Sequence, residues 1–198
     1  MFYTPKYNRD QINKIGNTII YLCKEMPNLS KTKLLKLIYL IQESSIKAYG
    51  IPFFNLKFNV WKLGPVSTAI FAELSQEPFL LSSFIDLKQK NGGTFVVPKQ
   101  DFCDDEFNDL ELDLLSKIAR SFKNLNANQL IEITHKKNGP WYITACEHGL
   151  IDAFDAGLAN VSDVEIDMSK LLEGQPEKLS IFNGYQEFLE NSQKLKNA

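Results

Sequence analysis

The side chains that could perform chemistry are few, and they are far apart in the sequence. The residues that could bind a soft metal ion are Cys23, Cys103, His135, Cys146 and His148. No C-x-x-C pair is present, and the Cys-Glu-His tripeptide that begins at Cys146 is not enough to indicate zinc binding. The sequence therefore predicts no metal site and no cofactor.

Known catalytic and nucleotide-binding motifs are also absent from the sequence. It has no Walker lysine loop, no G-x-G-x-x-G after a strand and no G-x-S-x-G. His135 could transfer protons, because it lies in a polar segment that ends in Gly139-Pro140-Trp141. No second catalytic residue has a recognisable spacing from it. We therefore favour a structural role, and we keep a hydrolase centred on His135 as an alternative.

The composition is that of an ordinary soluble globular protein. Of the 198 residues, 44% are hydrophobic and 23% are charged, and no apolar run approaches the ~20 residues that a membrane-spanning helix needs. The first ten residues lack the apolar segment of a secretory signal. An odd number of widely spaced cysteines favours a reduced, cytoplasmic protein. We expect one domain, with or without an appendage.

Charge is distributed unevenly along the chain. Residues 1–90 contain 12 Lys and Arg and 6 Asp and Glu, for a net charge of +6, whereas residues 91–198 contain 10 and 18, for a net charge of −8. This division indicates either charge complementarity within the fold or a bipolar surface that attracts a partner. It argues against general nucleic-acid binding, although the basic half keeps a nucleic-acid-binding regulator as an alternative.

The clearest single element is a helix from Ser30 to Gly50. Ser30 is a suitable N-cap, Gly50 is a suitable left-handed residue at the end, and Pro52 prevents the helix from continuing. Its apolar residues recur at helical spacing and cover a wide face: Leu34, Leu35, Leu37, Ile38, Leu40 and Ile41. A face this wide indicates a helix that other elements cover on more than one side.

Three lysines occupy the first turns of this helix, namely Lys31, Lys33 and Lys36. The helix dipole favours acidic residues at this end, so the lysines do not serve to stabilise the helix. They either lie in solvent with their stems over apolar surface, which we favour, or form a basic patch that binds an acidic partner.

Apolar periodicity and turn residues predict the remaining elements. Further helices are expected at about 9–26, 65–74, 106–123, 126–135, 162–172 and 179–195. Strands at 84–88 and 94–97 flank the turn Asn91-Gly92-Gly93, and we expect 58–61 to join them as a third strand. Residues 149–161 are expected to form a loop. The fold class is therefore α+β: a mainly α-helical domain with a small antiparallel β-sheet built on a hairpin near residues 84–97.

Four short segments together resemble a known family. They are K-L-L-K-L-I-Y-L at 33–40, G-I-P-F-F at 50–54, V-W-K-L-G-P-V at 60–66 and T-H-K-K-N-G-P-W at 134–141. In this order and approximate spacing they resemble the Panacea domain, the SocA-like antitoxin domain of bacterial and phage toxin–antitoxin systems. The resemblance covers roughly residues 12–172. It implies that the signature residues hold the fold: Lys33, Leu34, Leu37, Tyr39, Trp61, Gly64, Pro65, Val66, Thr134, His135, Gly139, Pro140 and Trp141.

The resemblance also implies a function. The chain would be an antitoxin, and not an enzyme, that neutralises a cognate toxin by direct protein–protein binding. The toxin is expected to be encoded next to it, and a variant mechanism would deliver the toxin to a protease. Contact with the partner is expected at Lys31, Lys33 and Lys36, at residues 76–105, and on the C-terminal segment at Phe182, Tyr185 and Phe188.

The sequence divides into a Panacea domain at residues 1–175 and a C-terminal helical extension at 176–198. The boundary follows from Gly174 and Pro176, which end the preceding helix, and from the limit of the resemblance. The extension could dock on its own domain, dimerise or bind a partner, because an amphipathic helix can occupy a groove in each case. We favour docking on its own domain.

Overall fold

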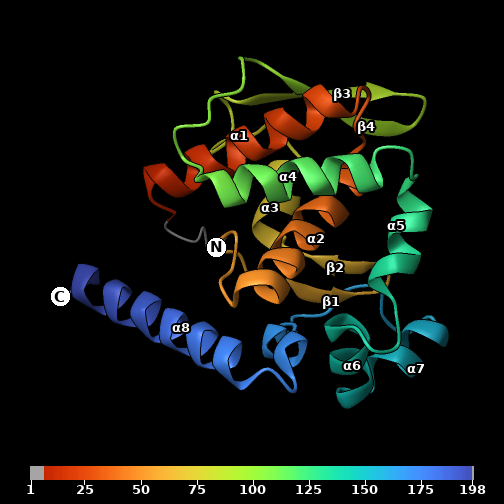
Figure 1. Ribbon diagram of the computed structural model, residues 1–198. Helices are drawn as coiled ribbons and strands as arrows, with labels where there is room; N and C mark the ends of the chain where they lie inside the picture. Colours follow the sequence, from red (N-terminus) through yellow and green to blue (C-terminus); the bar gives the residue numbers. More distant parts are fainter. Residues whose placement is uncertain (1–6, 198) are drawn as a thin grey trace.

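Helix α2 (Lys31–Tyr49) lies among the other elements, and the rest of the chain is arranged around it in the computed structural model, which describes residues 7–197 (Figure 1). The Ser30 side chain accepts a hydrogen bond from the backbone N–H of Lys33, and Gly50 ends the helix with a φ of 71°. All of residues 34–42 are buried. The predicted helix and its wide buried face are confirmed.

Asparagine capping boxes begin three of the surrounding helices. They are α1 (Arg9–Glu25), α4 (Asp109–Phe122) and α5 (Ala127–Thr134), which start after Asn8, Asn108 and Asn126. In each box the asparagine oxygen accepts a backbone N–H three residues on, and the side chain there accepts the backbone N–H of the asparagine. These local signals fix where the three helices begin, and for α4 they correct the expected start at about residue 106 to Asp109.

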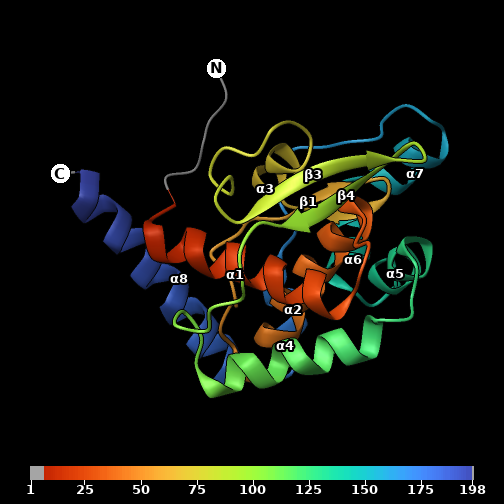
Figure 2. The ribbon, with the colours of Figure 1, turned by 90° about the horizontal axis from the view of Figure 1, so that it is seen from above.

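The predicted hairpin is confirmed as β3 (Ile85–Lys90) paired antiparallel with β4 (Gly93–Pro98). It lies beside α1, as seen from above in Figure 2. The backbone N–H of Val96 donates to the carbonyl of Leu29, so the free edge of β4 is bonded to the α1–α2 connection. A Cβ atom on Gly16 of α1 would lie 2.3 Å from the Phe84 ring, which explains a glycine there.

The expected third strand belongs to a different sheet. Strand β1 (Asn59–Trp61) pairs antiparallel with β2 (Gly64–Val66) and not with the hairpin. Residues 62–63 form the two-residue turn between them, and Gly64 follows with a φ of 95°. The helix expected from residue 65 is therefore corrected to α3 (Thr68–Glu73).

The other edge of β1 is covered by residues 160–166, where the sequence predicts a helix. The N–H of Val60 donates to the carbonyl of Val164, and the N–H of Ile166 donates to the carbonyl of Phe58. The hydroxyl of Ser162 donates to the carbonyl of Val60, so it does not cap a helix. Pairing with a distant strand replaces the local capping signal, and only the short 3₁₀ helix η1 (Met168–Leu172) remains.

Three helices complete the chain. Helix α6 (Pro140–Glu147) starts at Pro140, and α7 (Leu150–Asp155) lies within the segment that was expected to be a loop. Helix α8 (Pro176–Asn197) includes the predicted C-terminal helix, and its C-terminal end extends beyond the body in both views (Figures 1 and 2). Across residues 7–197, no helix combines the length and apolar character needed to cross a membrane.

The start of α8 is held against the end of α2. Phe182 packs with Ile46 and Leu172 in a small buried cluster, and the Lys178 ammonium donates to the carbonyl of Lys47 at 2.6 Å. Gly50 lies so close that an added Cβ would be 2.7 Å from the backbone oxygen of Lys178. The first half of α8 is therefore docked on its own domain.

Replacing Gly50 with alanine should loosen this contact. Strain at positive φ and the clash with the Lys178 carbonyl should together lower the free energy of unfolding by about 2 kcal/mol. Amide hydrogen exchange in α8 should also accelerate. Gly174→Ala is the matched control, because Gly174 has a φ of 76° and nothing within 4 Å of its added Cβ. Equal losses in urea unfolding for the two variants would contradict the docking described here.

Candidate partner-binding surface

The signature residues from β1, β2, α5 and α6 meet in one cluster. The Trp141 indole N–H donates to the carbonyl of Trp61 at 3.1 Å. The His135 ring packs edge-on against Trp141, with 3.8 Å between the ring centroids. A Cβ atom on Gly64 would lie 2.8 Å from the Thr134 hydroxyl oxygen, so only glycine lets these segments approach so closely. The two distant parts of the signature therefore form a single structural unit.

Lys36 reaches this cluster from α2. Its side chain is buried, with 2% of the residue exposed, and its ammonium donates to the carbonyl of Pro65 at 3.1 Å. Burial lowers the pKa of Lys36 from 10.5 to about 7, because the surroundings disfavour the charged form. Lys36 thus ties β2 to α2 from within the protein and does not present its charge at the surface.

His135 is held in the neutral form. Burial, and then the nearby Lys36 ammonium, lower its pKa from 6.5 to about 4. The Lys62 backbone has a smaller effect that raises this pKa. Its Nε2 atom is buried and has no hydrogen-bond partner within residues 7–197. A neutral imidazole that packs on Trp141 and has no ion-paired carboxylate within residues 7–197 fits a structural role.

The remaining signature residues lie in the core or at element boundaries. Leu34, Leu37, Tyr39, Pro65, Val66 and Pro140 are buried. Tyr39 packs edge-on against Phe58 at 5.3 Å, and burial followed by the Glu43 charge raises its pKa well above 10. Gly139 is the N-cap residue of α6. This arrangement is what a fold-determining signature would look like.

Lys31 and Lys33 differ from Lys36 because both reach the surface. The Lys31 ammonium lies 3.9 Å from the centroid of the Phe71 ring and donates to the Ser75 hydroxyl at 2.6 Å. The Lys33 ammonium donates to the carbonyl of Lys123 at the end of α4, where the helix dipole favours a cation. Partial burial lowers the pKa of both lysines.

The three candidate contacts on α8 have different environments. Phe182 is buried in the cluster that docks the helix, whereas 64% of Phe188 is exposed. Tyr185 is partly buried, and burial followed by the charge of Glu111 raises its pKa. Of these three side chains, Phe188 is therefore the one that is free to contact a partner.

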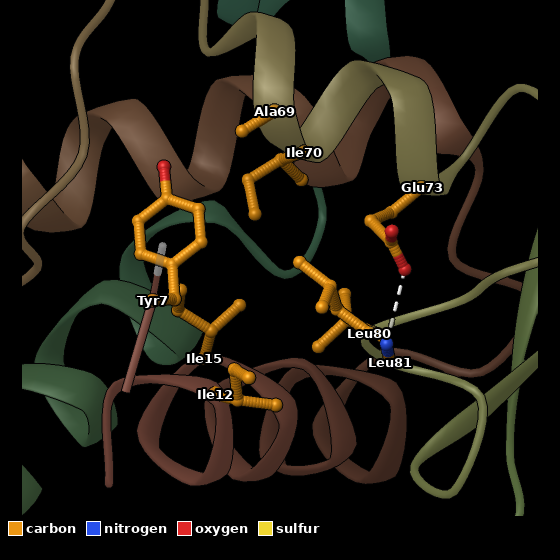
Figure 3. A pocket seen from close by; sticks show the side chains of 8 residues that line it. All are labelled: Tyr7, Ile12, Ile15, Ala69, Ile70, Glu73, Leu80 and Leu81. Atoms are coloured by element: carbon orange, nitrogen blue, oxygen red, sulfur yellow. Dashed lines mark hydrogen bonds between the residues drawn. The ribbon is translucent and has the colours of Figure 1, made fainter. Parts of the chain in front are cut away.

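The pocket in Figure 3 is too small for a ligand. It holds about 20 Å³ of water-accessible space, roughly one water molecule, and its walls are apolar apart from Tyr7 and Glu73. The Glu73 carboxylate accepts the backbone N–H groups of Phe79 and Leu81, both at 3.0 Å, and so fixes the loop after α3. The role of Glu73 is therefore structural.

The cysteines and histidines do not converge. Burial raises the pKa of the Cys23 thiol to about 12, as expected for a core residue, while Cys103 and Cys146 are exposed. Within the described part of the chain, no three His, Cys, Asp or Glu side chains are grouped so that they could hold a metal ion.

Sequence reasoning missed one surface feature, a group of exposed aliphatic residues in turns. Leu63, Leu158 and Val161 are 60%, 82% and 56% exposed. The N–H of Lys62 donates to the carbonyl of Asn160 at 2.9 Å, which brings the β1–β2 turn against the loop after α7. Isolated residues in turns have no periodicity, so the sequence carries no signal that they share a surface.

Comparison with protein families identifies the central part of this chain. The family model "Antitoxin SocA-like, Panacea domain" matches residues 34–142, more than half of the chain, and this range includes all the signature residues except Lys33. Comparisons with curated proteins and with solved structures gave no significant match. The match includes the α2, β1–β2 and α5–α6 residues that form the cluster around Trp141. The chain is therefore a member of the SocA-like antitoxin family, and its Panacea domain is built around α2.

Proposed function

We propose that this protein is the antitoxin of a toxin–antitoxin pair and neutralises its toxin by direct binding in the cytoplasm. The family match carries this proposal. We further propose that residues 1–175 form the toxin-binding domain and that 176–198 form an extension whose exposed Phe188 adds to the contact. Lys31 and Lys33 are proposed contacts, whereas the buried Lys36 is proposed to support the surface from below.

The environment of His135 supports a function without catalysis. The imidazole is neutral, packs on Trp141 and lies away from the small cavity lined by Tyr7 and Glu73. A hydrolase would need an activated nucleophile and an open pocket beside it. We accordingly propose that neutralisation occurs through occlusion of the toxin or, as the alternative within the same family, through delivery of the toxin to a protease.

Co-expression with each open reading frame that flanks the gene tests the proposal. We expect one neighbour to arrest growth when induced alone and this protein to restore growth when co-induced. The control is the same plasmid with an early stop codon in this gene, which should not restore growth. Absence of any rescued neighbour would contradict the proposal.

The amount of toxin during rescue separates the two mechanisms. Occlusion leaves the toxin level unchanged, and the toxin should co-purify with this protein in a stable complex. Delivery to a protease should shorten the half-life of the toxin by several-fold, and this effect should disappear in a host that lacks the protease. Immunoblots of tagged toxin after a translation block measure the half-life directly.

A further inference from the structure

Six lysines in the described chain are neutralised by a neighbouring acid, whereas a group of unpaired lysines gathers at one edge of the molecule. The ion-paired lysines are Lys14, Lys47, Lys57, Lys99, Lys117 and Lys170. Within residues 7–197, twelve lysines with described side chains have no ion-pair partner, and six of these are Lys31, Lys33, Lys62, Lys123, Lys136 and Lys137. These six begin or flank α2, α5 and the β1–β2 turn.

Contacts between the elements bring these six lysines to the same edge. Helix α5 packs along α2, and the Lys33 ammonium binds the carbonyl of Lys123 just before α5 begins. At the other end of α5, the His135 ring is close enough to the Lys62 backbone for that backbone to influence its pKa. In Figure 1 this is the side of the molecule on which α5 is drawn. Glu132 is the one acidic residue between residues 123 and 139.

Exposed apolar residues continue this basic edge. The Trp61 ring packs against Phe71 with 4.8 Å between centroids, and the Lys31 ammonium lies over the same Phe71 ring. Trp61 leads directly into the β1–β2 turn with its exposed Leu63, and the Lys62–Asn160 hydrogen bond adds Leu158 and Val161. We call the six lysines together with Leu63, Leu158 and Val161 the basic–apolar edge.

The edge is supported by a rigid interior. The signature cluster fixes both sides of the β1–β2 turn, because Trp141 binds the carbonyl of Trp61 and Lys36 binds the carbonyl of Pro65. A surface that is ordered before binding loses less conformational entropy when the partner arrives. This gives the buried signature a role in binding even though its side chains do not reach the partner.

We propose that the basic–apolar edge binds the toxin, and that the toxin contacts it with an acidic segment containing exposed apolar side chains. This rests on the proposed antitoxin function. Apolar residues in the middle of a contact and charges at its rim are typical of protein–protein interfaces. Aliphatic side chains such as Leu63, Leu158 and Val161 offer no stacking surface for bases, so a protein fits this edge better than a nucleic acid.

Two variants test the edge against matched controls. The variant Lys123→Glu/Lys136→Glu/Lys137→Glu reverses three exposed charges of the edge. Its control, Lys47→Glu/Lys57→Glu/Lys117→Glu, reverses the same number of exposed charges at lysines that are ion-paired and lie outside the edge. Leu63→Asp places a charge among the apolar residues. Its control is Leu110→Asp, because Leu110 is 59% exposed, almost the same as Leu63, but lies at the start of α4.

The readouts are growth rescue and the Kd for the purified toxin, which is the neighbour-encoded protein that wild type neutralises. We expect at least a 100-fold weaker Kd for the triple edge variant, at least 10-fold for Leu63→Asp, and changes below threefold for both controls. Raising the salt concentration should weaken wild-type binding more than binding by the triple edge variant. Circular dichroism and thermal melting verify that all variants fold.

The outcomes separate this inference from the proposed function. If wild type rescues no neighbour, the antitoxin proposal itself fails. If wild type rescues and both edge variants bind the toxin as tightly as wild type, only the location of the interface is wrong. A 30-nucleotide RNA serves as the competing probe. Binding of that RNA more tightly than toxin, with loss in the triple edge variant, would overturn the inference and make the edge a nucleic-acid interface.

Discussion

Replacing Gly64 with alanine is expected to lower the free energy of unfolding by about 4 kcal/mol and to abolish growth rescue. Two effects add in this estimate: strain at a φ of 95° and overpacking of a closed site, each costing about 1–3 kcal/mol. The new Cβ would lie 2.8 Å from the Thr134 hydroxyl and 3.1 Å from the Lys36 ammonium. Neither group can move freely, since Thr134 donates to the carbonyl of Ile131 and Lys36 to that of Pro65.

Urea unfolding followed by circular dichroism measures this loss. Gly92→Ala is the matched control, because Gly92 has a φ of 74° in the β3–β4 turn and nothing within 4 Å of its added Cβ. It should cost only about 1 kcal/mol from the backbone strain. A Gly64→Ala variant no less stable than Gly92→Ala would show that the close approach of β2, α2 and α5 is not needed for the fold.

Replacing Lys36 with methionine is expected to change the free energy of unfolding in the opposite direction. The variant should be more stable than wild type by about 3 kcal/mol at pH 6. A pKa of about 7 in place of 10.5 means that burying the ammonium costs up to about 5 kcal/mol below pH 7. Methionine has nearly the same length and removes this cost. It also leaves the Pro65 carbonyl without its hydrogen-bond donor, and this loss lowers the stability of the variant by about 1–2 kcal/mol.

The pH dependence identifies the origin of that gain. The unfolded chain binds a proton at Lys36 up to about pH 10.5, whereas the folded protein releases it near pH 7. Wild-type stability should therefore rise as the pH increases from 7 to 10.5, and the advantage of Lys36→Met should shrink over the same range. Below pH 7 the part of the advantage that comes from the Lys36 ammonium itself should stay constant.

Unfolding curves at pH 6 and pH 10 are the measurement for Lys36→Met, with the exposed Lys123→Met as the control that should change stability by less than about 0.5 kcal/mol. NMR titration provides a second readout. Without the Lys36 charge, the pKa of His135 should rise above about 4, while burial, the larger cause, still keeps it below 6.5. A Lys36→Met protein less stable than wild type at pH 6 would contradict the assigned cost of the buried ammonium.

The elements that the sequence predicts well are those specified by neighbouring residues. Helix α2 has its cap at Ser30 and its left-handed end at Gly50, and the β3–β4 hairpin has its turn at residues 91–92. Helices α4 and α5 likewise begin at asparagine capping boxes. Such signals act over about four residues, so they survive whatever the rest of the chain does.

The strand pairings that the sequence misses depend on distant partners. Strand β1 is sandwiched between β2 and residues 160–166, which lie about 100 positions away in the sequence. The Ser162 hydroxyl would suit a helix cap, but it binds the carbonyl of Val60 instead. Local propensity is a weak guide where backbone groups of a remote segment compete for the same donors and acceptors.

The candidate site was predictable to a different extent in its two layers. The buried layer follows from the resemblance, which groups Trp61, Gly64, His135 and Trp141 before any contact is known. The outer layer does not, because three lysines on one helix have three environments: Lys31 over Phe71, Lys33 at the end of α4, and Lys36 inside the protein. Tertiary packing decides which side of α2 is covered, and neither composition nor charge counts predict that packing.

The covered strand edges have a consequence for the free protein. Residues 160–166 bond to one side of β1, and the Leu29 carbonyl bonds to β4. The outer strand of the hairpin, β3, carries Asp86, Lys88 and Lys90. An open, apolar strand edge recruits further chains into intermolecular sheets, and charged or covered edges prevent this. We therefore expect the free protein to resist self-assembly through its strand edges, which can be checked by its sedimentation at high concentration.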